Sequence, residues 1–263
     1  ACGEKLDMAQ LQEIWEGKLE PVYPYRKAGP TVEKINGKLT APAAPKIGVA
    51  KPKVIIPVFP GTNCEYDTAK AFARAGADPE ILVIRNLTPA DVAESCKALV
   101  KAIDNSQIVM LPGGFSGGDE PDGSAKFIAS FFRNPEVTEA VRRLLQQRDG
   151  LMLGICNGFQ ALIKLGLVPY GDIRPITAYD PTLTFNTIGR HQSMLVRTRI
   201  ASTGSPWLSK CEVGEQFTVA ISHGEGRFVA PQEVLDTLMK NGQIATQYVD
   251  IEGNPTMDQS YNP

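Results

Sequence analysis

Cys156 is the residue whose type and neighbours point most directly to catalysis. It lies in the run Leu151-Met-Leu-Gly-Ile-Cys-Asn-Gly-Phe-Gln160, where an apolar stretch typical of a strand gives way to the start of a helix. Gly154 and Gly158 flank it as glycines flank the serine of a nucleophile elbow, and they permit a sharp turn that exposes the side chain. A helix N-terminus lowers the pKa of a nearby thiol, which favours the reactive thiolate. The alternative is a buried, unreactive cysteine in a strand-to-helix turn.

Two further turns follow apolar runs and carry unusual residues. The first is Phe59-Pro-Gly-Thr-Asn-Cys64, and the second is Pro112-Gly-Gly-Phe-Ser-Gly-Gly-Asp119. The glycines of the second turn allow backbone amides to point together at developing negative charge, so it is a candidate oxyanion hole. A phosphate-binding loop is the rival interpretation, but neither of the usual glycine spacings is present. A purely structural turn is the third possibility.

The elements that must position these turns alternate between strand and helix. Strands are expected at 54–59, 81–84, 108–111 and 151–155, and helices at 66–75, 90–102, 124–132 and 136–148. Beyond Pro169, strands are expected at 184–188, 194–200, 217–221 and 244–249, with a helix near 232–240. This order predicts an α/β fold with an open, mostly parallel sheet, helices on both faces and additional C-terminal strands. Ligands of such sheets collect at the carboxyl ends of the strands, where all three turns would converge.

Composition narrows the class of protein. The 263 residues carry a formal net charge of −2 and include five scattered cysteines. No basic excess favours nucleic acid, and no apolar run approaches the roughly 18 residues of a membrane span. The cysteine pattern and the lack of a signal peptide favour a reducing cytoplasm. Residues 1–52, rich in proline, are expected to be a linker from an upstream domain, with a short amphipathic helix at 7–16 capped by Asp7.

Together these motifs resemble the glutaminase domain of phosphoribosylformylglycinamidine synthase, a class I (triad) glutamine amidotransferase with a flavodoxin-like sheet. The likeness runs from about Lys53 to Pro263. It rests on the three turns in their order and on three later segments, namely Asn186-Thr-Ile-Gly-Arg190, Ser205-Pro-Trp-Leu208 and Ser222-His-Gly-Glu-Gly-Arg-Phe228.

The resemblance implies a role for each matching residue. Cys156 would attack the carboxamide of glutamine and form a thioester, while the N–H groups of Gly114 and Asn157 would hold the oxyanion. Gly113, Phe115 and Gln160 would line the glutamine pocket. The ammonia would pass to a formylglycinamide ribonucleotide synthetase domain of the same polypeptide. ATP and Mg²⁺ are expected in that domain, and no cofactor is expected in this chain. No nucleic-acid or membrane partner is expected.

One departure from the family pattern stands out. The family places its general-base histidine and a glutamate in a Gly-His-Pro-Glu-Arg stretch, and none occurs among these 263 residues, so the domain is expected to be truncated and poorly active. His223 is expected to hydrogen bond near the pocket or contact the partner domain, and His191 to be a half-exposed strand residue. Glu225 and Arg227 form either a surface ion pair or a tight loop aimed at a ligand or the synthetase domain. A silent interaction module and another elbow-cysteine hydrolase remain alternatives.

Two other groups are expected to be non-catalytic. Cys64 lacks a glycine on both sides and is expected to be structural. Asp119, Glu120 and Asp122 are expected to act as caps and solvated charge, and no metal is expected.

Overall fold

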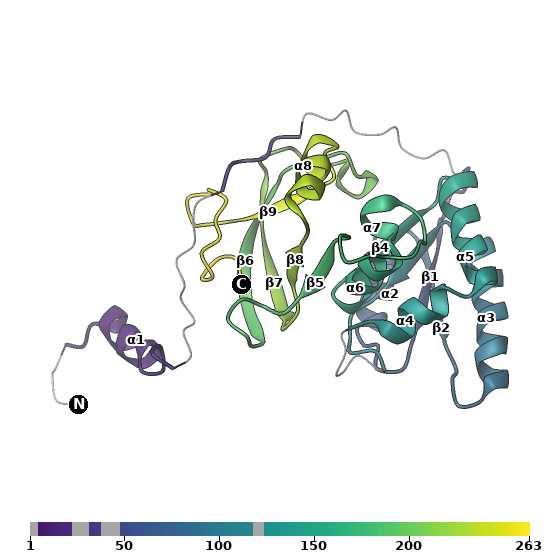
Figure 1. The fold of residues 1–263 in the computed structure, drawn as a ribbon, viewed down its shortest axis with the longest axis horizontal. Helices are drawn as coiled ribbons and strands as arrows, with labels where there is room; N and C mark the ends of the chain where they lie inside the picture. The colour runs from purple at the N-terminus through teal and green to yellow at the C-terminus, as the bar shows by residue number, and fades with distance from the viewer. Residues whose placement is uncertain (1–4, 23–31, 38–47, 118–123) are drawn as a thin grey trace. The chain divides into compact units, whose positions relative to one another are not determined.

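The computed structural model describes residues 5–22, 32–37, 48–117 and 124–263 (Figure 1). The chain divides into two compact units. The parallel unit comprises Ala43–Leu183 and Phe228–Leu235. The antiparallel unit comprises Ala1–Pro42, Thr184–Arg227 and Asp236–Pro263.

A four-stranded parallel sheet forms the centre of the parallel unit. Its strands are β1 (Lys53–Val58), β2 (Asp78–Val83), β3 (Ile108–Leu111) and β4 (Leu151–Gly154), in the order β2-β1-β3-β4. The register pairs Val54 with Ile108 and Leu111 with Gly154. All four predicted strands are therefore confirmed to within a few residues, and their carboxyl ends share one edge.

Helices cover both faces of this sheet, as predicted. They are α2 (Glu65–Arg74), α3 (Pro89–Asp104), α4 (Lys126–Phe132), α5 (Pro135–Arg142), the π-helical turn η1 (Arg143–Gln147), α6 (Asn157–Leu165) and α7 (Leu167–Tyr170). Alternate residues of β1 point to opposite faces. Val54 and Ile56 pack towards Phe72 of α2, whereas Ile55 joins the larger core formed with α3 to α6.

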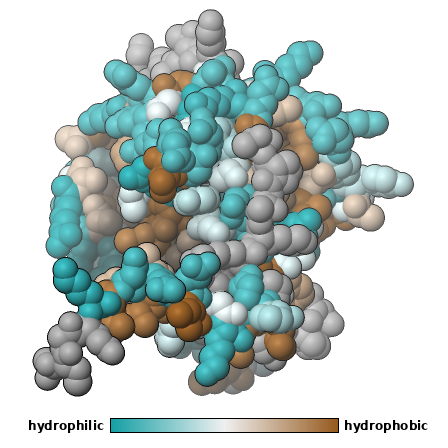
Figure 2. Space-filling model, turned by 90° about the vertical axis from the view of Figure 1, so that its left-hand side faces the viewer, coloured by the Kyte–Doolittle hydropathy of each residue, from teal (hydrophilic) through white to brown (hydrophobic). Residues whose placement is uncertain are grey.

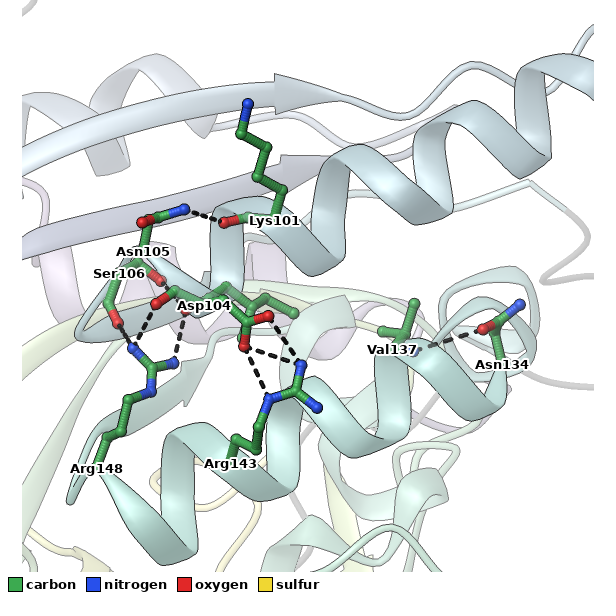
Figure 3. Close-up of polar contacts among 9 residues, drawn as sticks. Lys101, Asp104, Asn105, Ser106, Asn134, Val137, Arg143 and Arg148 are labelled. Atoms are coloured by element: carbon green, nitrogen blue, oxygen red, sulfur yellow. Dashed lines mark hydrogen bonds and ion pairs between the residues drawn. The ribbon is translucent and has the colours of Figure 1, made fainter.

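Arginines fix the C-terminus of α3 next to the start of β3 (Figure 3). Arg148 donates hydrogen bonds to the carbonyl oxygens of Ile103, Asp104 and Ser106 at 2.8, 2.9 and 2.9 Å. These bonds give carbonyl oxygens at and just after the end of α3 a charged donor. Arg143 reaches the Asp104 carboxylate with two nitrogens. The turn leading into β3 is thus tied to the turn leading into β4.

The antiparallel unit is built around three strands. β6 (Gln192–Ile200) lies between β7 (Gln216–His223) and β9 (Thr246–Val249), with all pairs antiparallel. The short helix η2 (Pro206–Leu208) lies between β6 and β7 along the chain. The three predicted strands are confirmed.

Two short strands differ from expectation. β5 (Thr182–Thr184) pairs with β8 (Arg227–Val229), and α8 (Gln232–Lys240) follows as predicted. The strand expected at 184–188 is wrong, because the chain turns after Thr184. Asn186 donates from its side-chain amide to Arg190 O at 3.0 Å, and Gly189 has a φ of 70°, which closes the turn.

The N-terminal helix α1 (Met8–Gly17) is confirmed. The Asp7 carboxylate caps it by accepting hydrogen bonds from the N–H groups of Ala9 and Gln10. Its apolar side chains, including Ile14 and Trp15, are exposed. Figure 2 shows hydrophobic residues at the surface of the molecule, in brown. None of the helices in the described part of the chain is long and apolar enough to cross a membrane.

Candidate active site

Cys156 occupies a strained turn between β4 and α6. Its backbone has φ 52° and ψ −112°, a combination that non-glycine residues rarely adopt. The side chain is exposed, and the residue is the N-cap of α6. Strained backbone of this kind clusters at active sites, where the surrounding structure enforces it. The predicted elbow geometry is therefore present at this cysteine.

The two flanking glycines are needed for close approach, not for a left-handed backbone. A Cβ atom on Gly158 would lie 2.0 Å from Leu111 O, and one on Gly154 would lie 2.6 Å from Gly158 O. Neither glycine has a positive φ. The sequence argument that they supply turn flexibility is thus corrected. They let the start of α6 press against β3 and β4, and Cys156 itself takes the unusual conformation.

The second loop passes beside the thiol. A Cβ atom on Gly113 would lie 3.3 Å from Cys156 Cβ and 3.9 Å from its Sγ. Gly114 pairs with Thr62 of the first loop in an antiparallel bridge whose hydrogen bonds are made by the neighbouring residues. In such a pair the N–H of Gly114 points away from the first loop.

The first loop fastens the second one in place. Asn63 N donates to Gly113 O at 3.0 Å, and Phe115 N donates to Gly61 O at 2.9 Å. A Cβ atom on Gly61 would lie 1.9 Å from Phe115 O, so only glycine fits there. Phe59 anchors the loop in the core by packing edge-on against aromatic rings of α4. The predicted convergence of all three turns is confirmed within the parallel unit.

Asn157 contributes a side-chain clamp that the sequence did not reveal. It is only 2% exposed, and its Oδ1 accepts a hydrogen bond from Ser116 N at 3.4 Å. Its Nδ2 donates to Gln160 Oε1 at 3.0 Å. The elbow is thus joined to both the second loop and the first turn of α6. Phe115 lies on the second loop with 73% of its surface exposed.

The motif at 222–227 lies in a separate polar network at the end of β7. The buried Asn186 accepts hydrogen bonds at Oδ1 from Gly226 N and His223 Nδ1, at 3.3 and 2.8 Å. This arrangement places the imidazole hydrogen on Nδ1 and leaves Nε2 as an acceptor. Burial lowers the pKa of His223, and the nearby His191 lowers it further. Asn186 was not predicted as a site residue, although its position in a quoted motif was a signal.

The structure also places His191, Glu225 and Arg227. His191, expected to be a half-exposed strand residue, is instead exposed and lies just before β6, and a hydrogen bond of 2.8 Å joins its Nε2 to Ser222 Oγ. Glu225 lies half-buried in the turn after β7, and Arg227 starts β8 with an exposed side chain. Both histidines of the chain belong to the antiparallel unit, so the unit that holds Cys156 contains none.

Comparison with known proteins agrees with this architecture. The profile of the CobB/CobQ-like glutamine amidotransferase domain matches residues 51–263. The chain belongs to this glutamine amidotransferase family. A relative from Methanococcus maripaludis, phosphoribosylformylglycinamidine synthase subunit PurQ, is 35% identical over 210 residues, covering 78% of this chain and 69% of the relative. The PurQ subunit of Rubrobacter xylanophilus is 33% identical over 198 residues, covering 75% and 76%.

The amidotransferase fold is also found among solved structures. The structure of PurLQS from Thermotoga maritima aligns with a TM-score of 0.55 and 23% identity, covering 81% of this chain and 84% of that chain. At this identity the alignment shows a common fold. It confirms the α/β class that the strand and helix pattern predicted.

Cys64 of this amidotransferase resembles Cys156 more than its sequence suggested. It is exposed, has a φ of 70° and is the N-cap of α2. Its Sγ lies 3.0 Å from Asn63 Oδ1. The two cysteines differ in their neighbours. Cys156 lies between Gly154 and Gly158, whose close approaches press α6 against the sheet.

The acidic run at 119–122 and the end of the second loop lie outside the described residues. The expectations for Asp119, Glu120 and Asp122 therefore stay predictions. Within the described ranges, no group of three or more histidine, cysteine, aspartate or glutamate side chains is arranged to hold a metal ion.

Proposed function

We propose that this chain is the glutaminase part of a phosphoribosylformylglycinamidine synthase. It would hydrolyse glutamine and deliver ammonia to a synthetase partner in purine biosynthesis. The observation that carries the proposal is the strained, exposed Cys156 at the N-cap of α6, with the second loop folded beside its thiol. The PurQ relatives supply the reaction in which such a glutaminase takes part.

The proposed reaction begins with attack by the Cys156 sulfur on the carboxamide carbon of glutamine. As the S–C bond forms, the π electrons of the C=O bond shift onto oxygen, and the N–H groups of Gly114 and Asn157 would hold the resulting oxyanion until the C=O bond re-forms and the C–N bond breaks. Loss of one such donor typically costs about 3 kcal/mol of transition-state stabilisation. The amine takes up a proton and leaves as ammonia. Water then cleaves the γ-glutamyl thioester to give glutamate and the free thiol.

The pocket proposal follows from the space beside the thiol. Gly113 is the residue whose missing side chain leaves room within 4 Å of Sγ, where a carboxamide must approach. Phe115 would cover the bound glutamine from the second loop. Gln160, whose Oε1 accepts a hydrogen bond from Asn157, would face the polar groups of the bound glutamine.

Proton transfer is the step that the parallel unit does not complete by itself. Neither of the two histidines lies in that unit, so the unit itself supplies no imidazole to protonate the leaving ammonia. We therefore expect the 263-residue chain alone to turn over glutamine slowly. The proposed synthetase partner would lie in the same polypeptide and would use ATP and Mg²⁺. The proposed compartment is the reducing cytoplasm.

A glutamine-like diazoketone tests the proposal directly. It should alkylate Cys156 selectively, as measured by intact mass and peptide mapping, and excess glutamine should protect the thiol. Cys64→Ala is the matched control, because it removes another exposed N-cap thiol and should leave the labelling unchanged. Iodoacetamide, which needs only an accessible thiol, reports the intrinsic reactivity of both cysteines. Labelling of Cys156 with no protection by glutamine would contradict a glutamine site.

A second candidate is a catalytically silent interaction module. The absence of histidine from the parallel unit favours it. The two candidates separate in the complete synthase, where Cys156→Ala should abolish glutamine-dependent synthesis and leave ammonia-dependent synthesis intact. A silent module would instead leave glutamine-dependent synthesis unaffected by this substitution.

A further inference from the structure

A short segment ahead of the family domain lies against the antiparallel sheet. Residues 32–37 precede the 51–263 match, yet they contact β6 and β9 of the antiparallel unit. The side-chain amide of Gln247 in β9 forms hydrogen bonds with two backbone groups of this segment. Its Oε1 accepts from Ile35 N at 2.9 Å, and its Nε2 donates to Glu33 O at 3.1 Å. One amide thus recognises an extended backbone through both an acceptor and a donor.

Arg199 of β6 continues the contact from the neighbouring strand. Arg199 and Gln247 are paired across β6 and β9, so their side chains share one face of the sheet. Arg199 is only 7% exposed, and its Nη1 donates to Ile35 O at 2.7 Å. Its Nη2 donates to Asn36 Oδ1. Within the described part of the chain, no carboxylate forms an ion pair with Arg199, so this segment supplies the acceptors that a buried guanidinium requires.

Both ends of the segment are also bound. Val32 N donates to Pro255 O at 3.1 Å, and Gly37 N donates to Ala201 O at 2.7 Å. Gly37 forms a parallel bridge with Ser202, and a Cβ atom on Gly37 would lie 2.9 Å from Ser202 Cβ. The surface therefore accepts an extended backbone that carries an amide side chain followed by glycine.

We infer that the antiparallel unit carries a binding site for an extended peptide segment, built on Arg199 and Gln247, and that residues 32–37 are its occupant. This site is independent of the proposed glutaminase chemistry. It anchors the chain ahead of residue 51 to the antiparallel unit. The part of the predicted linker at 32–37 thus acts as a docked strap, and any domain upstream is tethered at this surface.

Cleavage of the folded full chain tests this site. A protease sequence inserted between Ala43 and Ala44 separates the strap from the rest of the protein without removing it. The two pieces should co-elute on gel filtration after cleavage, and a synthetic peptide of residues 30–39 should displace the N-terminal piece. Peptide variants then probe recognition while the protein stays unaltered. Gly37→Ala should weaken displacement by about tenfold or more, which is ~1.4 kcal/mol, because its methyl group meets Ser202.

Lys34→Ala is the matched peptide control, because Lys34 is exposed in the middle of the strap and the contacts described above involve its neighbours. Its affinity should stay within about twofold of the parent peptide. In the protein, Arg199→Ala should release the N-terminal piece, with circular dichroism of the cleaved protein confirming the remaining fold. The inference is overturned if the pieces separate in the unaltered protein, or if the Gly37→Ala and Lys34→Ala peptides displace equally well.

Discussion

Replacing Cys156 by glycine should stabilise the parallel unit relative to replacing it by alanine. The backbone at this position has φ 52° and ψ −112°, which alanine tolerates poorly and glycine adopts freely. Residues held in such regions typically carry about 1–3 kcal/mol of strain. Both variants lack the thiol, so neither should be labelled by a diazoketone at position 156. The difference between them isolates the strain stored in the elbow.

Other contributions to the alanine-to-glycine difference must be removed. Glycine is favoured over alanine at helix N-caps, and it has more freedom to lose on folding. Asn134 provides the matched control. It caps α5 in the same unit with an ordinary φ of −55°, and its side chain accepts from the N–H of Val137 (Figure 3). Both effects operate there without positive-φ strain.

Urea unfolding of all four variants gives the measurement. We expect the gain in unfolding free energy from alanine to glycine to be larger at Cys156 than at Asn134 by about 1–3 kcal/mol. Equal gains at both sites would show that the elbow stores no strain, and the argument that the surrounding glycine contacts enforce a catalytic conformation would fail.

Three further predictions concern the loops and helix ends. Gly113→Ala should slow diazoketone labelling of Cys156 by about tenfold or more while iodoacetamide labelling changes little, because the methyl would sit 3.9 Å from Sγ. Because the folded-state pKa of His223 lies below the ordinary 6.5, the unfolded chain binds that proton more readily, and stability should fall as pH drops through 6.5 towards the folded pKa. His223→Gln should flatten this loss between pH 7.5 and 5.5 in urea unfolding, and an unchanged slope would contradict the assignment. Arg148→Met should lower the unfolding free energy by about 2–4 kcal/mol, since three carbonyls lose a charged donor, whereas Arg143→Met at an exposed ion pair should cost about 0–1 kcal/mol.

The centre of the parallel sheet was predictable because β1 is buried on both faces. Val54, Ile55 and Ile56 are fully buried, so β1 appears in the sequence as a continuous apolar run bounded by turn residues. The strand predicted at 108–111 coincides with β3. The helices between them begin at recognisable caps, such as Thr88 and Pro89 of α3.

The misplaced and missed strands depend on contacts between distant residues. The chain around Asn186 looks β-prone from its composition, but the Asn186 side chain bonds to His223 O, 37 positions away, and this fixes a turn. β8 is only three residues long, and its partner β5 lies far back in the sequence. A local pattern carries no information about either pairing, so single-sequence reasoning could not place them.

The sequence located the candidate site, but the structure gives some of its motif residues a different role from the one predicted. The glycine-rich motifs were interpreted as chemistry, yet Gly61, Gly154 and Gly158 are explained by backbone atoms that approach within 1.9–2.6 Å of a would-be Cβ. These glycines allow the three turns to pack closely together at one edge of the sheet. The Asn157 clamp follows from the same stacking, because its amide reaches Ser116 only when the second loop already lies against the elbow.

This division between packing and chemistry bears on where activity can be lost. The proposed reacting groups of the parallel unit are one thiol, which attacks, and two backbone N–H groups, which donate to the oxyanion, so no side chain is required as an oxyanion donor. Backbone donors cannot be deleted by ordinary substitution, so the site should fail mainly when loop stacking fails. Substitutions at the close-approach glycines should therefore reduce stability and glutamine-mimic labelling together, whereas Cys156→Ala should abolish labelling with the loops still stacked. That contrast separates a residue that reacts from residues that hold the reacting groups in place.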